Sequence, residues 1–171
     1  MNYNLIVATD NKGGIGNNNE IPWYIKNDLK MFSNLTKGNY KNCIIMGRKT
    51  WESLPRKPLP NRINIILSST ISVNNKTTAT FKSIEDIHNL CMLHRFDSCW
   101  VIGGENIYKS FINRNLIKSI YLTIIEDSYV CNRYFDFDQN NYKLIESKQR
   151  IELDEKNNKN VVCNYCVFNI K

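Results

Sequence analysis

A carboxylate, Asp28, interrupts an apolar helical pattern and is the first candidate for chemistry in this sequence. The spacing predicts a helix over 26–36, with Ile25, Leu29 and Phe32 on one face and Asp28 beside Phe32. Burying a carboxylate without a partner is costly, so this acid needs a cation, hydrogen-bond donors or a ligand opposite it. No nearby basic residue serves that purpose. The alternative is an ordinary first-turn acid that interacts with the helix dipole.

Glycines mark two connections from a predicted strand to a predicted helix, Met46-Gly47-Arg48-Lys49-Thr50 and Ile102-Gly103-Gly104-Glu105. Backbone amides at helix starts bind anions, and glycine lets a phosphate approach closely. Arg48 and Lys49 suit a phosphate dianion such as the 2′-phosphate of NADP. Further donors would come from Ser68, Ser69 and Lys82. The alternative is a pair of tight turns with solvated surface charges.

Arg62 follows the rigid segment Pro58-Leu59-Pro60-Asn61. Its planar guanidinium could bind a carboxylate through two parallel hydrogen bonds. A surface role is the alternative.

Cysteines and histidines occur at two places with the spacing of metal ligands. The six cysteines lie in apolar segments, which favours reduced core thiols over a disulfide framework. Cys163 and Cys166 have metal-binding spacing, but residues three apart on a strand face opposite sides. His88, Cys91 and His94 share helical spacing without an evident fourth ligand. We therefore expect no bound metal.

Length and charge narrow the class of protein. A chain of 171 residues with 42% hydrophobic residues suits one domain, residues 1–171. No apolar run approaches the roughly 20 residues that cross a bilayer, so we expect a soluble cytoplasmic protein without membrane contact. The net charge of +7 is spread along the chain without a nucleic-acid-binding motif, which favours anionic small molecules over nucleic acid.

Elements of two kinds alternate and must position these side chains. Predicted strands cover 3–9, 42–46, 62–67, 98–102, 119–125, 142–149 and 161–170, and predicted helices cover 26–36, 50–54, 83–93 and 105–113. This order indicates an α/β fold with a mainly parallel sheet and an antiparallel C-terminal edge. Ligands of such sheets bind at the carboxyl ends of the strands, where both glycine connections lie.

Taken together, these segments resemble dihydrofolate reductases over nearly the whole chain. The resemblance rests on Ile6-Val7-Ala8, Gly14-Ile15-Gly16, Ile21-Pro22-Trp23, Asp28 with Phe32, the segment from Ile45 to Leu54, Pro58 to Arg62, Asn64 to Ser69, and Ile102 to Tyr108. It implies a sheet of about eight strands with about four flanking helices. It also implies reduction of 7,8-dihydrofolate to 5,6,7,8-tetrahydrofolate by NADPH, in support of one-carbon metabolism and thymidylate synthesis, by a monomer.

The resemblance also implies roles for matching positions. The catalytic group would be Asp28, Trp23, Thr123 and Tyr108. The substrate would contact Val7, Ala8, Ile21, Asp28, Leu29, Phe32, Leu54, Leu59, Arg62, Ile102 and Thr123. The cofactor would contact Ala8, Ile15, Gly16, Gly47, Arg48, Lys49, Thr50, Leu67, Ser68, Ser69, Lys82, Ile102, Gly103, Gly104, Glu105, Asn106, Ile107 and Tyr108.

In this assignment Asp28 pairs with pterin N3 and the 2-amino group, and Thr123 supports the same network. Arg62 takes the α-carboxylate of the glutamate tail, and Trp23 holds a water near the acid. The glycine-containing loop over 10–20 would close over the nicotinamide.

Two departures from the family pattern bear on the cofactor side. Cys131-Asn132-Arg133 replaces a turn that steadies the loop, and Glu105 puts an acid beside the pyrophosphate. Two other classes remain open, an NADPH-dependent pyrimidine reductase of riboflavin synthesis and a nonenzymatic basic binding protein.

Overall fold

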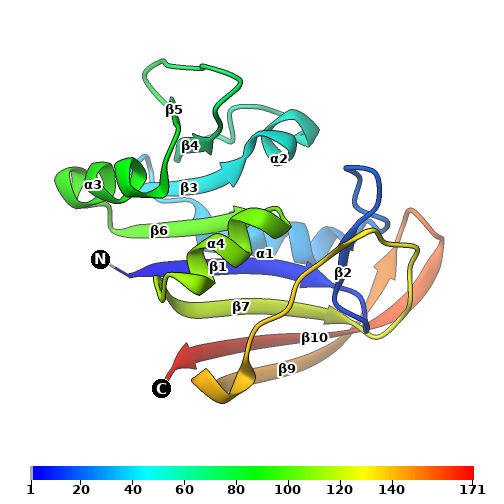
Figure 1. The fold of residues 1–171 in the computed structure, drawn as a ribbon. Helices are drawn as coiled ribbons and strands as arrows, with labels where there is room; N and C mark the ends of the chain where they lie inside the picture. The colour runs from blue at the N-terminus through cyan, green and yellow to red at the C-terminus, as the bar shows by residue number, and fades with distance from the viewer. Residues whose placement is uncertain (1) are drawn as a thin grey trace.

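Apolar runs form the central strands of the sheet in this computed structural model, which describes residues 2–171. Within those residues eight strands pair in the order β5-β4-β3-β6-β1-β7-β10-β9. The first six of that order are β5 (Thr78–Phe81), β4 (Ile63–Leu67), β3 (Asn42–Gly47), β6 (Ser98–Gly103), β1 (Tyr3–Thr9) and β7 (Ile117–Ile125), all parallel. The long strands β9 (Tyr142–Asp154) and β10 (Lys159–Ile170) add the antiparallel edge. The predicted mixed sheet is confirmed (Figure 1).

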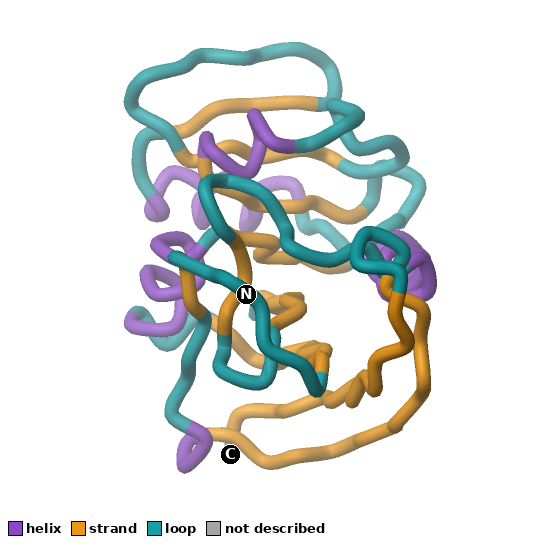
Figure 2. The backbone as a smooth tube through the Cα atoms, turned by 90° about the vertical axis from the view of Figure 1, so that its right-hand side faces the viewer, coloured by secondary structure: helices purple, strands orange, loops and turns teal. Residues whose placement is uncertain are grey.

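Helices cover both faces of the sheet because side chains alternate along its strands. On one face α1 (Lys26–Thr36) and α2 (Arg48–Ser53) contribute Phe32 and Trp51 to a cluster with Ile44 of β3. On the other face α3 (Ile84–His94) and α4 (Glu105–Asn113) pack Ile87 and Phe111 into the largest core cluster. Figure 2 shows the helices on either side of the strands. None of the helices described in residues 2–171 has both the length and the apolar character that a bilayer crossing requires.

The predicted element bounds hold best where the hydrophobic pattern is strong. The predicted strand 3–9 and the predicted helices 26–36 and 105–113 are found with those bounds. Ser83 caps α3 as expected, because its Oγ accepts the Asp86 N–H at 3.1 Å. The helix predicted from Thr50 begins two residues earlier, at Arg48.

Several short strands and one strand end were missed. These are β5 and the two-stranded ribbon of β2 (Gly14–Gly16) with β8 (Arg133–Tyr134), all too short to show a period. A 3₁₀ turn, η1 (Gln139–Asn141), precedes β9. Strand β9 continues to Asp154 instead of ending at Gln149, because β10 pairs with it along its whole length. That extension turns Glu152 and Asp154 inward.

The β9–β10 hairpin holds the segment that leads into α1. Asp154 is fully buried and accepts the Tyr24 N–H at 3.0 Å and the Tyr129 hydroxyl at 2.8 Å. Asn157 donates to Asp154 at 2.7 Å and to the Pro22 carbonyl at 2.9 Å. Burial raises the pKa of Asp154, but these hydrogen bonds outweigh it and the net pKa is lowered. The hairpin thereby fixes residues 22–24, immediately before α1.

We predict that Asp154→Ala lowers the free energy of unfolding by about 1–3 kcal/mol, because buried donors lose their acceptor. Since the folded-state pKa is depressed, the contribution of Asp154 is present above its unfolded pKa and is lost as pH falls through the folded value. Urea unfolding at pH 7 and under acid conditions measures both effects. Glu155→Ala, which breaks a solvent-exposed pair with Lys26, is the control. Equal stability of Asp154→Ala and the wild type at pH 7 would contradict the anchoring role.

Candidate active site

Asp28 points from the first turn of α1 toward the sheet and is hydrogen-bonded there. The Thr123 hydroxyl of β7 donates to Asp28 Oδ1 at 2.7 Å. Thr123 itself is buried, and β7 lies beside β1, where Thr123 pairs with Ala8. The acid therefore faces inward as predicted, against the middle of the sheet. This arrangement leaves the second carboxylate oxygen, Oδ2, without a hydrogen bond from residues 2–171.

The electrostatic surroundings of Asp28 disfavour its charge. Desolvation by burial raises its pKa to about 6, the Thr123 hydrogen bond lowers it, and the charge of Glu152 raises it further. No lysine, arginine or histidine of residues 2–171 forms an ion pair with Asp28. A carboxylate that titrates near neutrality is suited to exchange or stabilise a proton.

Glu152 is a second inward carboxylate that the sequence reasoning missed. It is 6% exposed and accepts the Asn27 side-chain amide at 2.7 Å and the Tyr165 hydroxyl at 3.1 Å. Asn27 is the neighbour of Asp28 in α1, so Glu152 links this turn of the helix to the C-terminal hairpin. The available signal was the alternating segment Ile151-Glu152-Leu153-Asp154, which can continue the strand. Its two acids are two residues apart and therefore face the same side of the sheet.

Arg62 is buried without a carboxylate of its own. The residue is 2% exposed, its Nε donates to the Pro60 carbonyl at 3.0 Å and its NH1 donates to Thr36 Oγ1 at 2.7 Å. The guanidinium lies 5.8 Å from the centre of the Phe32 ring, and burial lowers its pKa. No acidic side chain of the described chain pairs with it. Such a cation, fixed on two sides, is available to an external carboxylate.

Apolar side chains between Asp28 and Arg62 are only partly covered by protein. Phe32, Leu54 and Leu59 are half-buried and pack on the cluster of Ile6 and Met46. Two other predicted substrate contacts, Ile21 and Leu29, remain 56% and 42% exposed. Ile25, expected on the same face of α1 as Leu29, is only 2% exposed, and contact of Leu29 with a substrate stays a prediction. An exposed apolar surface beside a buried acid suits a flat, partly polar ligand.

Trp23 lies in the wall next to this surface. The residue is 6% exposed, and its ring packs on Tyr129 at a centroid distance of 5.1 Å. It belongs to a cluster with Ile25 and Cys163, against which Ala8 packs. No direct bond joins Trp23 to Asp28 in the described residues, and its predicted water-holding role stays a prediction.

The two glycine connections meet at the carboxyl ends of β3 and β6. Met46 pairs with Gly103, and a Cβ on Gly47 would lie 3.0 Å from Ile107 of α4. Gly103 has a φ of +114°, and a Cβ there would lie 3.0 Å from the ring of Tyr108. Both features restrict this position to glycine.

The starts of α2 and α4 are open to a ligand. A Cβ on Gly104 would lie 3.5 Å from Thr50 Oγ1, so the starts of both helices are close together. Neither helix has a side-chain cap on its first amides. This combination of uncapped amides and close backbone approach suits the phosphates of a dinucleotide.

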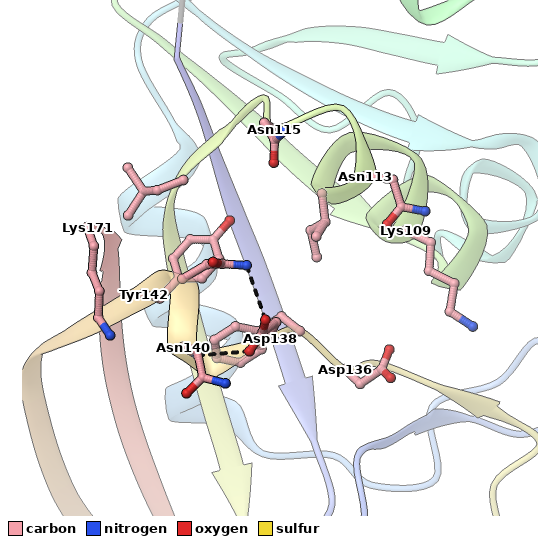
Figure 3. A pocket seen from close by; sticks show the side chains of 12 residues that line it. Lys109, Asn113, Asn115, Asp136, Asp138, Asn140, Tyr142 and Lys171 are labelled. Carbon is pink, nitrogen blue, oxygen red and sulfur yellow. Dashed lines mark hydrogen bonds between the residues drawn. The ribbon is translucent and has the colours of Figure 1, made fainter.

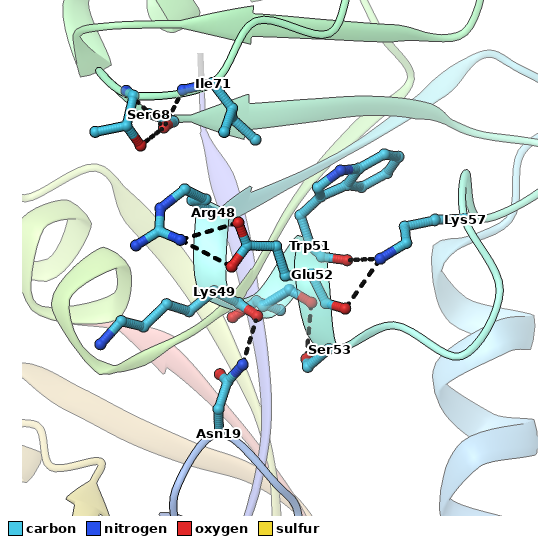
Figure 4. A network of polar contacts seen from close by, with 11 residues as sticks. Asn19, Arg48, Lys49, Trp51, Glu52, Ser53, Lys57, Ser68 and Ile71 are labelled. Carbon is cyan, nitrogen blue, oxygen red and sulfur yellow. Dashed lines mark hydrogen bonds and ion pairs between the residues drawn. The ribbon is translucent and has the colours of Figure 1, made fainter.

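The predicted phosphate-binding cations are present at the start of α2. Figure 4 shows Arg48 and Lys49 extending to the same side, the left of the view, with Ser68 above Arg48. Arg48 currently holds Glu52 through two hydrogen bonds of 2.8 and 2.9 Å, while Lys49 is exposed. Ser68 Oγ accepts the N–H groups of Thr70 and Ile71, so its oxygen is engaged in the turn. Ser69 and Lys82 are exposed.

Tyr108 has a structural contact that sequence reasoning did not foresee. Its hydroxyl donates to the Ile6 carbonyl at 2.9 Å, and its ring packs edge-on against Phe135. Burial raises its pKa far above the usual range, so the phenol stays protonated. Tyr108 is therefore fixed between β1 and the Gly103 turn and borders the site through its ring.

The negative charge of Glu105, which the sequence places beside the expected pyrophosphate site, is offset by two neighbouring cations. Lys109 donates to it at 2.8 Å, and Arg133 lies 3.7 Å from its other oxygen. The Lys109 hydrogen bond is the main cause of its lowered pKa. Two cations thus offset this carboxylate next to the Gly103-Gly104 turn.

The loop over 10–20 is attached to the Cys131-Asn132-Arg133 segment. The Asn132 N–H donates to the Gly16 carbonyl at 2.9 Å, and the Asn132 side-chain amide donates to Asn18 Oδ1 at 3.0 Å. In return the Asn18 N–H donates to Asn132 Oδ1 at 3.2 Å. Cys131 fills the space above Gly14, where a Cβ would lie 2.6 Å from its sulfur. The segment therefore couples to the loop through a pair of neutral amides.

The remaining predicted substrate and cofactor contacts differ in how far they are exposed. Val7 and Ile107 are buried, whereas Ile15, Leu67 and Ile102 are half-buried and Asn106 is exposed. Gly16 sits in the β2–β8 ribbon.

The histidine-based metal arrangement on α3 does not form. His88 Nδ1 bonds to the Tyr3 hydroxyl at 3.0 Å, and His94 stacks on Phe96. Cys163 and Cys166 lie in different surroundings, since Cys163 belongs to the Trp23 cluster and Cys166 contacts Ser147.

A roomy polar cavity of about 530 Å³ lies elsewhere, between the end of α4 and the C-terminus. Figure 3 shows Asp136, Asp138 and Lys109 around it, with Asn140 and Asn141 bonded to Asp138. None of the predicted site residues lines it. Its walls carry four asparagines together with Ile112, Phe137 and Ile170.

Comparison with known proteins agrees with this geometry. The chain matches the family described as dihydrofolate reductase over residues 2–168. A dihydrofolate reductase of Bacillus subtilis (strain 168) is 37% identical over 154 residues, covering 90% of this chain and 86% of that protein. One of Aedes albopictus is 29% identical over 178 residues, covering 97% and 96%. A bifunctional dihydrofolate reductase-thymidylate synthase of Plasmodium berghei (strain Anka) is 39% identical over 134 residues, covering 70% and 23%. The arrangement of Asp28, Arg62 and the glycine connections agrees with these matches. Because the family match extends over nearly the whole sequence, this chain belongs to the dihydrofolate reductase family of nicotinamide-dependent oxidoreductases.

Proposed function

We propose that this protein reduces 7,8-dihydrofolate to 5,6,7,8-tetrahydrofolate with NADPH, as a cytoplasmic monomer that needs neither nucleic acid nor a membrane. The observation that carries the proposal is the Asp28 carboxylate, hydrogen-bonded to Thr123 at 2.7 Å and without a cation partner in residues 2–171. A protonated heterocycle with adjacent N–H donors would supply the missing positive charge and donors.

The substrate ring would lie between Asp28 and the half-buried side chains of Phe32 and Leu54. One carboxylate oxygen is held by Thr123, which leaves the other for ring N3 and the 2-amino group. Ile21 and Leu29, which are exposed in this structure, would be covered by the bound ring system. Burial of their apolar surface contributes roughly 25 cal/mol per Å² to binding.

The glutamate tail would reach Arg62. Thr36 and the Pro60 carbonyl hold the guanidinium in place, and Phe32 lies against its face. Because these contacts orient the planar group before a ligand arrives, little side-chain entropy is lost on binding. An acid and a guanidinium that both lack an oppositely charged protein partner suit a substrate with a hydrogen-bonding ring at one end and a carboxylate at the other.

The cofactor side fits a dinucleotide phosphate on three counts. Gly104 leaves the backbone bare beside Thr50, the amides at the starts of α2 and α4 lack side-chain caps, and Arg48 and Lys49 supply positive charge at the start of α2. Ala8, Ile15, Thr50 and the ring of Tyr108 would border the nicotinamide. Bound NADPH would supply the hydride for pterin C6.

The residues of the chain would supply alignment and charge. Thr123 holds the Asp28 carboxylate in one orientation, and Asp28 places negative charge next to the ring as N5 takes up a proton. Its pKa of about 6 allows it to respond to that protonation near neutral pH. The loop over 10–20, held by Asn132, would exclude water from the nicotinamide.

We expect the purified protein to oxidise NADPH when dihydrofolate is added, more slowly with NADH, and Asp28→Asn to lower turnover about 100- to 1000-fold at pH 7. Absorbance of the reduced cofactor measures both. A pyrimidine reductase would use its own pyrimidine substrate instead, and a binding protein would use neither. Turnover within a fewfold of wild type in Asp28→Asn would refute the role of the acid.

The same variant has a stability readout that separates lost function from lost fold. Because the folded-state pKa of Asp28 is raised to about 6, its ionisation weakens the fold. This loss of stability is absent below the pKa that Asp28 has in the unfolded chain, and it develops as the pH rises through the pKa in the folded protein. Asp28→Asn should therefore be at least as stable as wild type at pH 7, measured by urea unfolding without ligands.

Arg62→Lys should raise KM for dihydrofolate roughly 10- to 100-fold, because a hydrogen-bonded charge pair contributes about 1.5–3 kcal/mol. The matched control is a 7,8-dihydropterin that lacks the glutamate tail, whose kcat/KM should not change. Steady-state kinetics with both substrates give the ratio. An equal loss for both would place the effect in the fold and remove Arg62 from tail binding.

Glu152→Gln should shift the alkaline decline of turnover to lower pH, on the order of half a pH unit, about 0.7 kcal/mol. The reason is that Glu152 places negative charge near Asp28, and hence near the proposed position of the ring, where it favours protonation of N5; the variant removes that charge. Thr123, Tyr165 and Cys163 also face this region and are unchanged. Glu146→Gln, an exposed acid on β9, is the control. A pH profile that does not move in Glu152→Gln would count against the coupling.

A further inference from the structure

Three thiols from three different elements converge in the core. Cys43 of β3 and Cys99 of β6 are direct neighbours across the parallel strand pair, and Cys91 of α3 lies over them. All three residues are at most 1% exposed. Their sulfur atoms lie within 4.8 Å of one another, and Cys43 Sγ is 3.9 Å from Cys91 Sγ. No other group of three or more metal-ligating side chains of this kind is found in residues 2–171.

The spacing of the sulfurs matches a trigonal metal site. Metal–thiolate bonds are about 2.3 Å long, so an ion at the centre of three sulfurs needs S···S distances of about 4.0 Å. The Cys43–Cys91 distance of 3.9 Å meets that requirement. The third sulfur lies within the same 4.8 Å, so a small side-chain rotation closes the triangle.

The neighbouring polar groups favour three sulfur ligands over a four-ligand zinc site. Tyr3 lies next to Cys91, and its hydroxyl bonds to His88 Nδ1 at 3.0 Å. That bond turns the imidazole to the tyrosine and away from the role of fourth ligand. Structural zinc is almost always four-coordinate, whereas soft thiolate ligands also select Cu(I).

We propose that Cys43, Cys91 and Cys99 form a site for one soft metal ion of the Cu(I) class, bound by three sulfurs. The site lies near the amino ends of β3 and β6, opposite the glycine junction at Gly47 and Gly103. The four residue-to-residue steps from Cys43 to Gly47 span about 13 Å of strand. The ion therefore stabilises the sheet and takes no part in hydride transfer. This differs from our sequence-based expectation of no metal, which weighed ligands only within single elements.

The test is a competition titration of the whole, reduced chain under anaerobic conditions. Cu(I) is supplied as its coloured complex with bathocuproine disulfonate, and loss of colour reports transfer to the protein. We expect one equivalent per chain and a higher thermal unfolding midpoint, since an ion that binds the folded state stabilises it. X-ray absorption should show three sulfurs at about 2.3 Å.

Variants assign the site without relying on activity. Cys91→Ser and Cys91→Ala should each weaken Cu(I) binding at least about tenfold and abolish the thermal shift, with folding verified by circular dichroism. Cys131→Ser and Cys166→Ser are matched controls that should bind as wild type, because neither belongs to the cluster. If both Cys91 variants unfold, Cys99→Ala replaces them. Absence of transfer, transfer that persists in the cluster variants, or transfer that depends on Cys131 would each overturn the proposal.

Discussion

The fold is organised around the difficulty of holding one carboxylate where water is scarce and no cation is near. Asp28 is placed by the first turn of α1, and α1 is placed by the hairpin that binds residues 22–24 through Asp154 and Asn157. Thr123 supplies the hydrogen bond that keeps the acid in one orientation. The raised pKa measures how strongly the surroundings disfavour the charge, and this strain on the free protein is what a cationic ligand relieves.

The parallel strand order supplies the second half of the site. Because β3 and β6 are neighbours and both end in glycine, the starts of α2 and α4 meet at one edge of the sheet. Tyr108 returns from α4 to bond the Ile6 carbonyl of β1, so the same turn is tied to the strand that carries Ala8. Acid and phosphate regions thus share one rigid framework, which is what alignment of two rings requires.

Sequence reasoning located the elements and the chemistry-bearing residues where periodicity or motif was strong. It identified the inward acid, the glycine connections and the mixed sheet, because these follow from local pattern and chain order. It missed Glu152, since the strand containing it is set by pairing with β10 and not by its own hydrophobicity. It did not indicate how exposed Leu29 would be, because spacing on a helix says which residues share a side but not whether the sheet covers that side. The pairs of Arg48 with Glu52 and of Glu105 with Lys109 have the i,i+4 spacing of neighbours on a helix and could have been read from the sequence. The contact of Glu105 with Arg133 is long-range and has no such signal.

The loop over 10–20 is attached partly by charged groups, since Glu20 lies 3.8 Å from Lys156 and Asp10 accepts the Tyr129 N–H. The paired amides of Asn18 and Asn132 are the neutral part of this attachment. Neither side chain gains or loses a proton anywhere in the physiological range, and no counter-ion screens their mutual bonds. Acidification that neutralises Asp28 therefore leaves the bonds between Asn18 and Asn132 unchanged, and so does a change of ionic strength. Only the contacts of Asp10 and Glu20 make the hold on this loop sensitive to charge.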